Sequence, residues 1–216
     1  MKVISTNVAV SRPDPSQRYE YTGIDKQPRE FIELAVPGPH YGDGSGVVGD
    51  AIGDHKHHGG AEKAVYAYPR EELDYWQGEL GRELRNGAFG ENLTTQGVDL
   101  TKLLINQRLH VGEAVLEVSI PREPCATFAA WLGEKGWVKT FTQRGDCGAY
   151  LRIITPGRIS PGDTIELVGR PEHDVTMGMA FRAKMGDMEL ARHVVEVGCL
   201  APVHHDKLAA RVARTR

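Results

Sequence analysis

The stretch "RLHVGEAVLEVSI", Arg108 to Ile120, decides the fold class of this chain. Its small and apolar residues recur at every second position on both sides of a Gly-Glu break: Leu109, Val111, Ala114, Leu116 and Val118. A period of two around a short break that contains glycine is typical of two antiparallel strands with one buried face. We therefore predict a β-hairpin here and a fold built mainly on strands.

Five further segments have the same character, because they are short and rich in valine, isoleucine and tyrosine. They are "KVISTNVAV" (2–10), "EFIELAV" (30–36), "KAVYAY" (63–68), "AYLRIIT" (149–155) and "DTIELV" (163–168). Turn-forming clusters such as "PGPHYGDGSG", "TPGR" and "SPGD" separate them. Many short strands between turn signals predict a barrel or a sandwich.

Two helices are expected among these strands. "REELDYWQGELG" follows Pro69, which suits the first helical position, and ends at Gly81. The second helix begins after Pro124 in "PCATFAAWLGEKG". The sequence thus predicts a mainly β fold with helices (α+β).

The last forty residues predict three short helices. The first is "GMAFRAKM" (178–185), the second covers 188–197 between an Asp187 N-cap and a Gly198 stop, and the third runs from Pro202 through Val212. We place a barrel domain at residues 1–174 and a three-helix domain at residues 175–216. The second is too small to bury a core of its own, so it should dock on the barrel or on a partner.

Composition excludes several classes of protein. The chain has 216 residues, a formal net charge of -3 and 40% hydrophobic residues, which indicates a soluble globular protein without a membrane span. The N-terminus has no signal-peptide pattern, so we expect a cytoplasmic protein. Its three cysteines form no C-x-x-C pair, which predicts free thiols. The helical tail is basic, but too sparsely for specific nucleic-acid binding.

The segment "DHKHHGGAEK", residues 54–63, combines three histidines with two glycines. Glycines disfavour a helix, so we predict a loop in which the amides of Gly59 and Gly60, with Lys63, are available to an anion. Two alternatives stay open. The glycines could serve a turn with solvated histidines, including His57 and His58, or Asp54, His55 and His57 could bind zinc.

"SIPREPCATFA" places Cys125 between Pro124 and the start of a helix, three residues after Arg122. The helix N-terminus and the cation both favour a thiolate, which could be a nucleophile or a ligand for a soft metal. The alternative is a small buried residue, the usual role of a free cysteine.

Two glycine-framed segments add polar candidates. In "GAFGENLTTQG" (87–97), Glu91 and Asn92 could orient a ligand or close a turn. In "QRGDCGAYLRI" (143–153), Arg144 and Arg152 suit phosphate recognition, or they could be solvated residues on a strand edge.

The order of these motifs resembles one family closely. With "GD" (49–50), "PGDTIELV" and "RPEHDVT" in register, the chain is similar to YiiM-type MOSC domains over most of residues 40–176. The helical tail resembles the three-helix domain that follows the MOSC domain in that group. One departure is Asp146, which stands where the family pattern often has an arginine, beside Cys147.

The resemblance implies a MOSC-type β-barrel that binds the molybdenum cofactor, with Cys125 as the protein ligand to the metal. It also implies reductive removal of the N-hydroxyl group from bases such as 6-N-hydroxylaminopurine, with electrons from a separate reductase. Pyridoxal phosphate binding is a wider family association, and a homodimer is left open. The residues expected around the cofactor are His57, His58, Gly59, Gly60, Lys63, Glu91, Asn92, Arg122, Arg144 and Arg152. A rival hypothesis is a carrier module that holds the cofactor or sulfane sulfur without catalysis.

Overall fold

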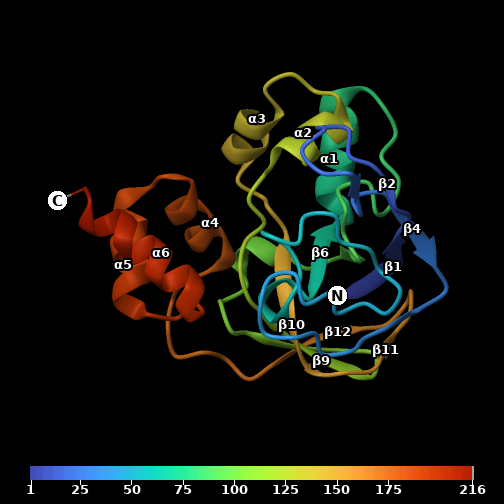
Figure 1. Cartoon of the computed structure of the whole chain (residues 1–216). Coiled ribbons are helices and arrows are strands. Elements are labelled where there is room, and N and C mark those ends of the chain that lie inside the picture. The colour runs from blue at the N-terminus through green and yellow to red at the C-terminus, as the bar shows by residue number, and fades with distance from the viewer. Residues whose placement is uncertain (216) are drawn as a thin grey trace.

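Eight strands form one strongly curled sheet in the order β12-β8-β9-β10-β6-β7-β1-β4 (Figure 1). The computed structural model describes residues 1–215. The strands are β1 Lys2–Ala9, β4 Lys26–Arg29, β6 Val65–Pro69, β7 Leu93–Gln96, β8 Arg108–Val111, β9 Ala114–Val118, β10 Ala149–Thr155 and β12 Ile165–Val168. Neighbours are antiparallel except β6 and β7, which run parallel on either side of a helical connection. Two-stranded pairs join β2 Arg12–Pro13 to β3 Tyr21–Thr22, and β5 Ile32–Glu33 to β11 Arg158–Ile159.

The curl brings the two ends of the sheet together. The Val3 amide donates to the Asp163 carbonyl at 2.9 Å, and the Ile165 amide donates to the Met1 carbonyl at 2.9 Å. These bonds connect β1 to the start of β12, so the sheet forms a half-barrel with little exposed edge on that side. The predicted α+β fold is confirmed.

The β8–β9 hairpin is confirmed in its predicted register. Val111 lies opposite Ala114, and the five alternating residues are all buried. Gly112 in the turn has φ +58°, and a Cβ there would lie 2.7 Å from the Arg158 carbonyl oxygen. Glycine is therefore required both by the backbone angle and by the close approach of a neighbouring chain segment.

Three helices cover one end of the half-barrel. They are α1 Arg70–Leu80, α2 Ala126–Leu132 and α3 Trp137–Arg144. The prediction that Pro69 is the first residue of α1 is wrong. Its extended backbone (ψ 140°) makes it the N-cap of the helix and the last residue of β6. Helix α3 was not predicted, because its sequence is largely polar. Its buried Trp137 and Phe141 are held by tertiary contacts, with the Trp137 ring centroid 4.6 Å from that of Trp76.

Strand prediction was weakest at polar segments. Neither β4, "KQPR", nor β7, "LTTQ", was predicted, since their composition does not alternate between apolar and polar residues. In the predicted strand 30–36 only Ile32–Glu33 pair as a strand, and Leu34 adds an isolated bridge to Val47.

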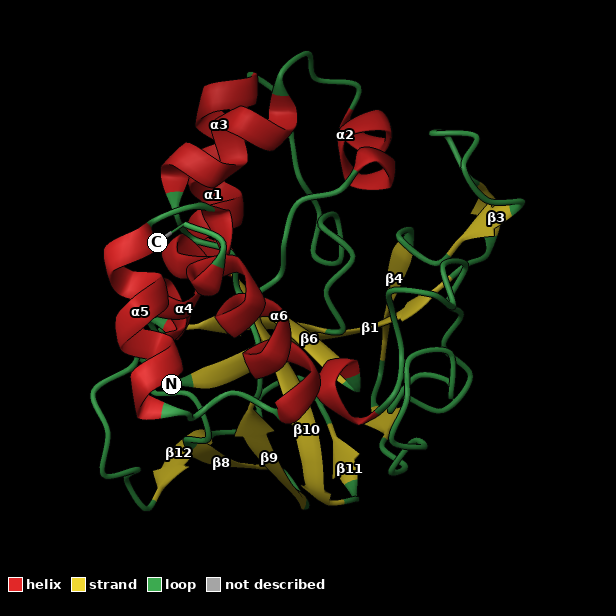
Figure 2. Cartoon of the chain, turned by 60° about the vertical axis from the view of Figure 1, so that its left-hand side comes forward, coloured by secondary structure: helices red, strands yellow, loops and turns green. Residues whose placement is uncertain are grey.

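The C-terminal tail forms α4 Met177–Met185, α5 Met188–Val197 and α6 Pro202–Ala213, as predicted. The Asp187 carboxylate accepts a hydrogen bond from the Leu190 amide at 3.0 Å, and Gly198 ends α5 in the left-handed conformation. Figures 1 and 2 both show these helices gathered on one side of the half-barrel. The domain boundary between residues 174 and 175 stays a prediction. None of the helices within residues 1–215 has the length and apolar character that a membrane span needs.

Candidate functional site

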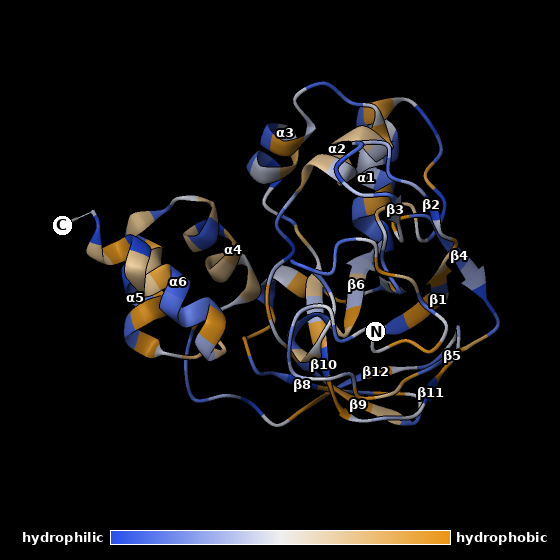
Figure 3. Ribbon diagram, viewed as in Figure 1, coloured by the Kyte–Doolittle hydropathy of each residue, from blue (hydrophilic) through white to orange (hydrophobic). Residues whose placement is uncertain are grey.

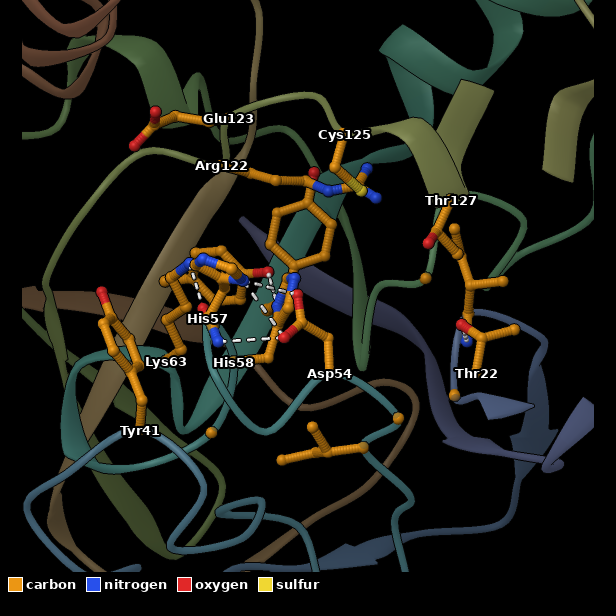
Figure 4. A pocket seen from close by; sticks show the side chains of 18 of the residues that line it. Thr22, Tyr41, Asp54, His57, His58, Lys63, Arg122, Glu123, Cys125 and Thr127 are labelled. Carbon is orange, nitrogen blue, oxygen red and sulfur yellow. Dashed lines mark hydrogen bonds and ion pairs between the residues drawn. The ribbon is translucent and has the colours of Figure 1, made fainter. Parts of the chain in front are cut away.

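A cavity of about 570 Å³ lies where the half-barrel, the 54–63 loop and the helical tail meet. Cys125, Arg122, Lys63, His57 and His58 all line it, and Figure 4 shows them converging from separate segments. Seven lysines or arginines line the cavity against three aspartates or glutamates. A concave site with this excess of positive charge favours an anionic ligand.

Residues 54–60 form a loop as predicted and a 3-10 helix follows at Ala61–Lys63, but the Gly60 amide differs from the prediction. Gly59 and Gly60 have φ +79° and +72°, and a Cβ on Gly60 would lie 2.1 Å from the His40 carbonyl oxygen. The Gly60 amide donates to the Gly44 carbonyl at 2.9 Å. The expectation that this amide is available to an anion is therefore wrong, because its hydrogen bond to Gly44 already occupies it.

Lys63 is the cation of this loop that faces the cavity. Its Nζ donates to the His57 carbonyl at 2.8 Å and lies 5.3 Å from the Tyr41 ring centroid and 5.2 Å from that of Tyr150. Burial lowers the pKa of Lys63 to about 8, although the nearby Glu123 carboxylate opposes this effect. Lys63 is thus a desolvated cation without an ion pair among residues 1–215, which suits a bound anion.

The two neighbouring histidines have different environments. His57 is exposed and its Nδ1 lies 3.0 Å from the Asp54 carboxylate. Burial raises the pKa of Asp54, but hydrogen bonds from Tyr19 and His57 outweigh this and leave it below its usual range. Burial and the Lys63 charge lower the pKa of His58 to about 3, so this imidazole is neutral beside the Tyr150 hydroxyl, 3.3 Å from its Nδ1.

Cys125 is the N-cap residue of α2 and is partly exposed to the cavity. Charge on its sulfur would raise the pKa values of Lys63 and Arg122, which places both cations within electrostatic reach of it. The second cysteine near the motif, Cys147, is fully buried, and its Sγ donates to the Gly148 carbonyl. Of these two cysteines, only Cys125 is available to a ligand in the cavity.

Arg122 is the most unusual cavity residue, because its guanidinium is buried without an acidic partner. The residue is 5% exposed, and its Cζ lies 3.7 Å from the Phe128 ring centroid and 5.1 Å from that of Tyr66. Its buried Nη1 has no hydrogen-bond partner among the described residues. An unpaired buried donor of this kind is costly unless a ligand satisfies it.

Glu91 and Asn92 support the site rather than face it. The Glu91 carboxylate is fully buried and accepts from the Phe89 amide at 3.0 Å, so it closes the turn, and it does not line the cavity. Asn92 lines the cavity, but its side chain accepts from the Tyr66 amide and donates to Asp50. Both residues therefore fix the backbone around the cavity.

Asp50 is a supporting residue to which sequence analysis gave no role. Its carboxylate binds Lys26 at 2.6 Å, Ser45 at 3.0 Å and the Ala9 amide at 2.7 Å. Burial raises the pKa of Asp50, but the Lys26 charge and these hydrogen bonds outweigh burial and hold the pKa below its ordinary value. The "GD" motif thus ties the 45–50 loop to β1 and β4.

Arg144 and Arg152 lie outside the cavity. The Arg144 guanidinium binds both Glu72 oxygens, at 2.8 and 2.6 Å. Arg152 pairs with Glu62 at 2.8 Å and with Glu117 at 3.0 Å. The structure does not bring either guanidinium to the ligand space around Cys125.

The tail supplies cavity residues that sequence analysis missed. Lys184 of α4 and His204, Lys207, Leu208 and Arg211 of α6 line the same cavity as Cys125. The Tyr41 hydroxyl and His204 Nε2 are 3.0 Å apart, and Lys184 pairs with Glu123 at 2.8 Å. In the sequence, only the basic character of the tail pointed to these residues, and it does not show where they lie relative to the cavity.

Within residues 1–215, no three His, Cys, Asp or Glu side chains are grouped closely enough to hold a metal ion. His57 Nδ1 contacts the Asp54 carboxylate, whereas His55 Nε2 lies 3.4 Å from the Tyr21 hydroxyl. The zinc alternative therefore lacks a ligand set. A single cavity-facing cysteine instead suits a metal that arrives with ligands of its own.

The fold and cavity define an α+β half-barrel protein with a basic, cysteine-containing ligand site. Residues 54–166 match the MOSC domain. The chain is 37% identical to uncharacterized protein YflK of Bacillus subtilis over 77% of its length and 72% of that protein. It is 31% identical to protein YiiM of Escherichia coli, over 70% of this chain and 68% of that one. The protein therefore belongs to the MOSC domain family.

Two further similarities bear on architecture and activity. The crystal structure of YiiM from Geobacillus stearothermophilus superimposes with a TM-score of 0.77 over 98% of both chains at 24% identity, which supports the fold including the tail. A reductase of Gibberella moniliformis is 34% identical over 62% of this chain, which covers 24% of that longer protein.

Proposed function

We propose that this protein is a molybdenum-cofactor-dependent reductase that removes the N-hydroxyl group from N-hydroxylated bases such as 6-N-hydroxylaminopurine. The observation that carries the proposal is the buried, unpaired Arg122 guanidinium beside a cavity-facing Cys125. Membership of the MOSC domain family and the similarity to a fungal reductase support an oxidoreductase that uses this cofactor.

The residues present fit such a cofactor. Cys125 would provide the thiolate ligand, because sulfur donors suit a soft, high-valent metal. Lys63 and Arg122 would hold the anionic part of the pterin cofactor, since Lys63 is a partly buried cation and Arg122 a buried one, and neither forms an ion pair among residues 1–215. The rings of Tyr66 and Tyr150, 5.0 Å apart between centroids, form one wall of the cavity.

Removal of an N-hydroxyl group needs two electrons and two protons. The N–O bond breaks, the amine and water form, and a separate reductase protein supplies the electrons. When bound, the cofactor provides the two-electron redox centre. The protein then has to bind the substrate, exclude competing water and deliver protons to the leaving oxygen.

His57 is the residue of this chain best placed to hold a proton for the leaving hydroxyl. Its Nδ1 is engaged by Asp54, and the residue lines the cavity. An imidazole can act as a general acid, whereas burial and the Lys63 charge keep His58 neutral. A His57→Gln variant that keeps both its molybdenum and the full kcat would remove this role.

The proposal is tested by purifying the protein from host cells that make the cofactor and from cells that cannot. Protein from the competent host should contain about one molybdenum per chain and reduce 6-N-hydroxylaminopurine with a chemical reductant. Protein from the deficient host should show neither property. Cys125→Ser should lower the rate by roughly two orders of magnitude or more and release the metal.

Cys199→Ser is the matched control, because Cys199 is a half-buried thiol of the tail that does not line the cavity. It should keep both metal and activity. Full activity in Cys125→Ser would overturn the ligand assignment. One bound molybdenum without turnover of any N-hydroxylated base would instead support the carrier alternative.

A further inference from the structure

The helical tail closes the cavity and contributes cations to it. Helix α4 provides Lys184, and helix α6 provides His204, Lys207 and Arg211. Figure 3 shows much of α6 in blue, which marks its hydrophilic residues. The cavity is therefore a joint site of the half-barrel and the tail.

The lysines from the two parts converge on one tyrosine and one histidine. Lys63 Nζ lies 5.3 Å and Lys207 Nζ 5.7 Å from the same Tyr41 ring centroid. The Tyr41 hydroxyl contacts His204. Burial, followed by the charges of Lys184, Lys63 and Lys207, lowers the pKa of His204 to about 3. Three lysines thus act electrostatically on a single neutral imidazole.

An acidic side chain pairs with only one of the tail cations, since Glu123 is paired with Lys184 at 2.8 Å. Within residues 1–215 neither Lys207 nor Arg211 forms an ion pair, and Arg211 Nη1 donates to the Lys184 carbonyl at 2.8 Å. Lys207 and Arg211 are exposed residues that line the cavity, so water screens their charges and both remain free to bind an anion there.

The proposed cofactor leaves these tail cations without an anion. Under the proposed function, Lys63 and Arg122 on the half-barrel side would hold its phosphate. Lys207 and Arg211 are then available to an anionic group of the other molecule in the site, the substrate. A phosphomonoester fits best, because it carries close to two negative charges and accepts several hydrogen bonds from lysine and arginine.

We propose that Lys207 and Arg211 bind the phosphate of an N-hydroxylated nucleoside monophosphate, so that nucleotides rather than free bases are the preferred substrates. This inference rests on the proposed function. It makes the tail a specificity element of the half-barrel site.

The test compares N6-hydroxyadenosine monophosphate with N6-hydroxyadenosine on molybdenum-loaded protein. The monophosphate should have a kcat/KM at least about tenfold higher. In Lys207→Gln/Arg211→Gln this ratio should fall to within about twofold of one. The matched control is Arg192→Gln/Arg214→Gln, which removes two exposed tail charges outside the cavity and should keep the ratio.

Calorimetry of the same loaded protein with AMP and adenosine gives a readout that needs no turnover. AMP should bind at least about tenfold more tightly than adenosine, and the Lys207/Arg211 variant should lose the difference. If no N-hydroxylated compound is reduced but AMP shows this preference, the proposed function fails while the phosphate site stands.

Three outcomes would overturn the inference. The first is equal binding of AMP and adenosine by the wild-type protein. The second is loss of the preference in the control variant, which would indicate general charge steering. The third combines two results: the Lys207/Arg211 variant loses its molybdenum, and the wild-type protein shows no nucleotide preference. That result would assign the tail cations to a phosphate of the cofactor.

Discussion

Two cavities formed by residues 1–215 both contain arginines and acidic side chains but differ in how their charges are paired. The first, of about 570 Å³, is lined by Cys125 and Arg122, whereas the second, of about 720 Å³, is lined by Glu72, Arg144 and Asp146. Both arginines stack on an aromatic ring, at 3.7 Å on Phe128 and 3.8 Å on Tyr75. Only Arg144 has a carboxylate partner.

This difference teaches that charge pairing distinguishes the two cavities. In the second cavity, two hydrogen bonds pair the Arg144 guanidinium with Glu72. In the first cavity, Arg122 has a buried donor without a partner among residues 1–215, at a cost in stability that a bound anion would offset. Unpaired charge therefore makes the first cavity the candidate ligand site.

The largest expected effect is an opposite change of stability in two arginine variants. Arg122→Met should raise the free energy of unfolding of the cofactor-free protein by about 1–2 kcal/mol, because it removes an unsatisfied buried donor. Arg144→Met should lower it by about 1–3 kcal/mol, because it leaves the Glu72 carboxylate unpaired. Chemical denaturation of both variants measures the contrast.

The molybdenum content of the two variants should also differ, but here the Arg122 variant is the one that is impaired. Arg122→Met should lower it by about tenfold, whereas Arg144→Met should leave it at the wild-type value. Destabilisation by Arg122→Met, together with full metal content, would show that the two arginines have the same structural role.

An intermediate effect concerns the pH dependence of the first cavity. Because the pKa of Lys63 is lowered to about 8, its positive charge is lost as the pH rises through 8. Binding of inorganic phosphate to the cofactor-free protein should therefore weaken by about threefold to tenfold between pH 7 and 9. Lys63→Arg should flatten this profile, since arginine keeps its charge. An unchanged slope in that variant would assign the pH dependence to another group.

The smallest expected effect compares buried titratable groups of the two cavities. Burial and then the Glu72 charge raise the pKa of Asp146 from 3.8 to about 7. The folded state therefore binds the Asp146 proton more tightly than the unfolded state does. The stabilisation of the fold that results from this proton is lost as the pH rises from about 4 to 7. Asp146→Asn should therefore become progressively more stable relative to the wild type as the pH rises through this range.

His204 in the first cavity should have the opposite slope and serves as the control. Its pKa is lowered from 6.5 to about 3, so its contribution is complete above pH 6.5 and is lost as the pH falls. His204→Gln should therefore reduce acid destabilisation below pH 6.5. Parallel pH profiles for the Asp146 and His204 variants would contradict the environments described for both groups.

Local patterns predicted much of the fold because they act between neighbouring residues. The period-two alternation located the β8–β9 hairpin, and the Asp187 and Gly198 caps bounded α5. Helix α3 and strand β4 were missed because long-range partners hold their largely polar sequences, as in the contact between Trp137 and Trp76. Such segments have no strong period of their own.

For the candidate site, the sequence predicted which groups are chemically suited but not all of their positions. It selected Cys125, Arg122 and Lys63, which the structure brings to one cavity. It also included Arg144 and Arg152 among the cofactor-binding candidates, although both lie outside the cavity, and it provided no means of placing Lys207 near Lys63. The contact between the tail and Tyr41 joins residues 163 positions apart.

The sequence by itself determined the strand-rich fold class, the helix caps of the tail and the adjacency of Arg122 to Cys125. Only the tertiary structure decided which charges are neutralised. Glu72 lies 72 positions from Arg144, and Glu62 lies 90 positions from Arg152. Electrostatic energy depends on distance in space and on burial, so the arginine that keeps its charge for a ligand is identified only once the chain has folded.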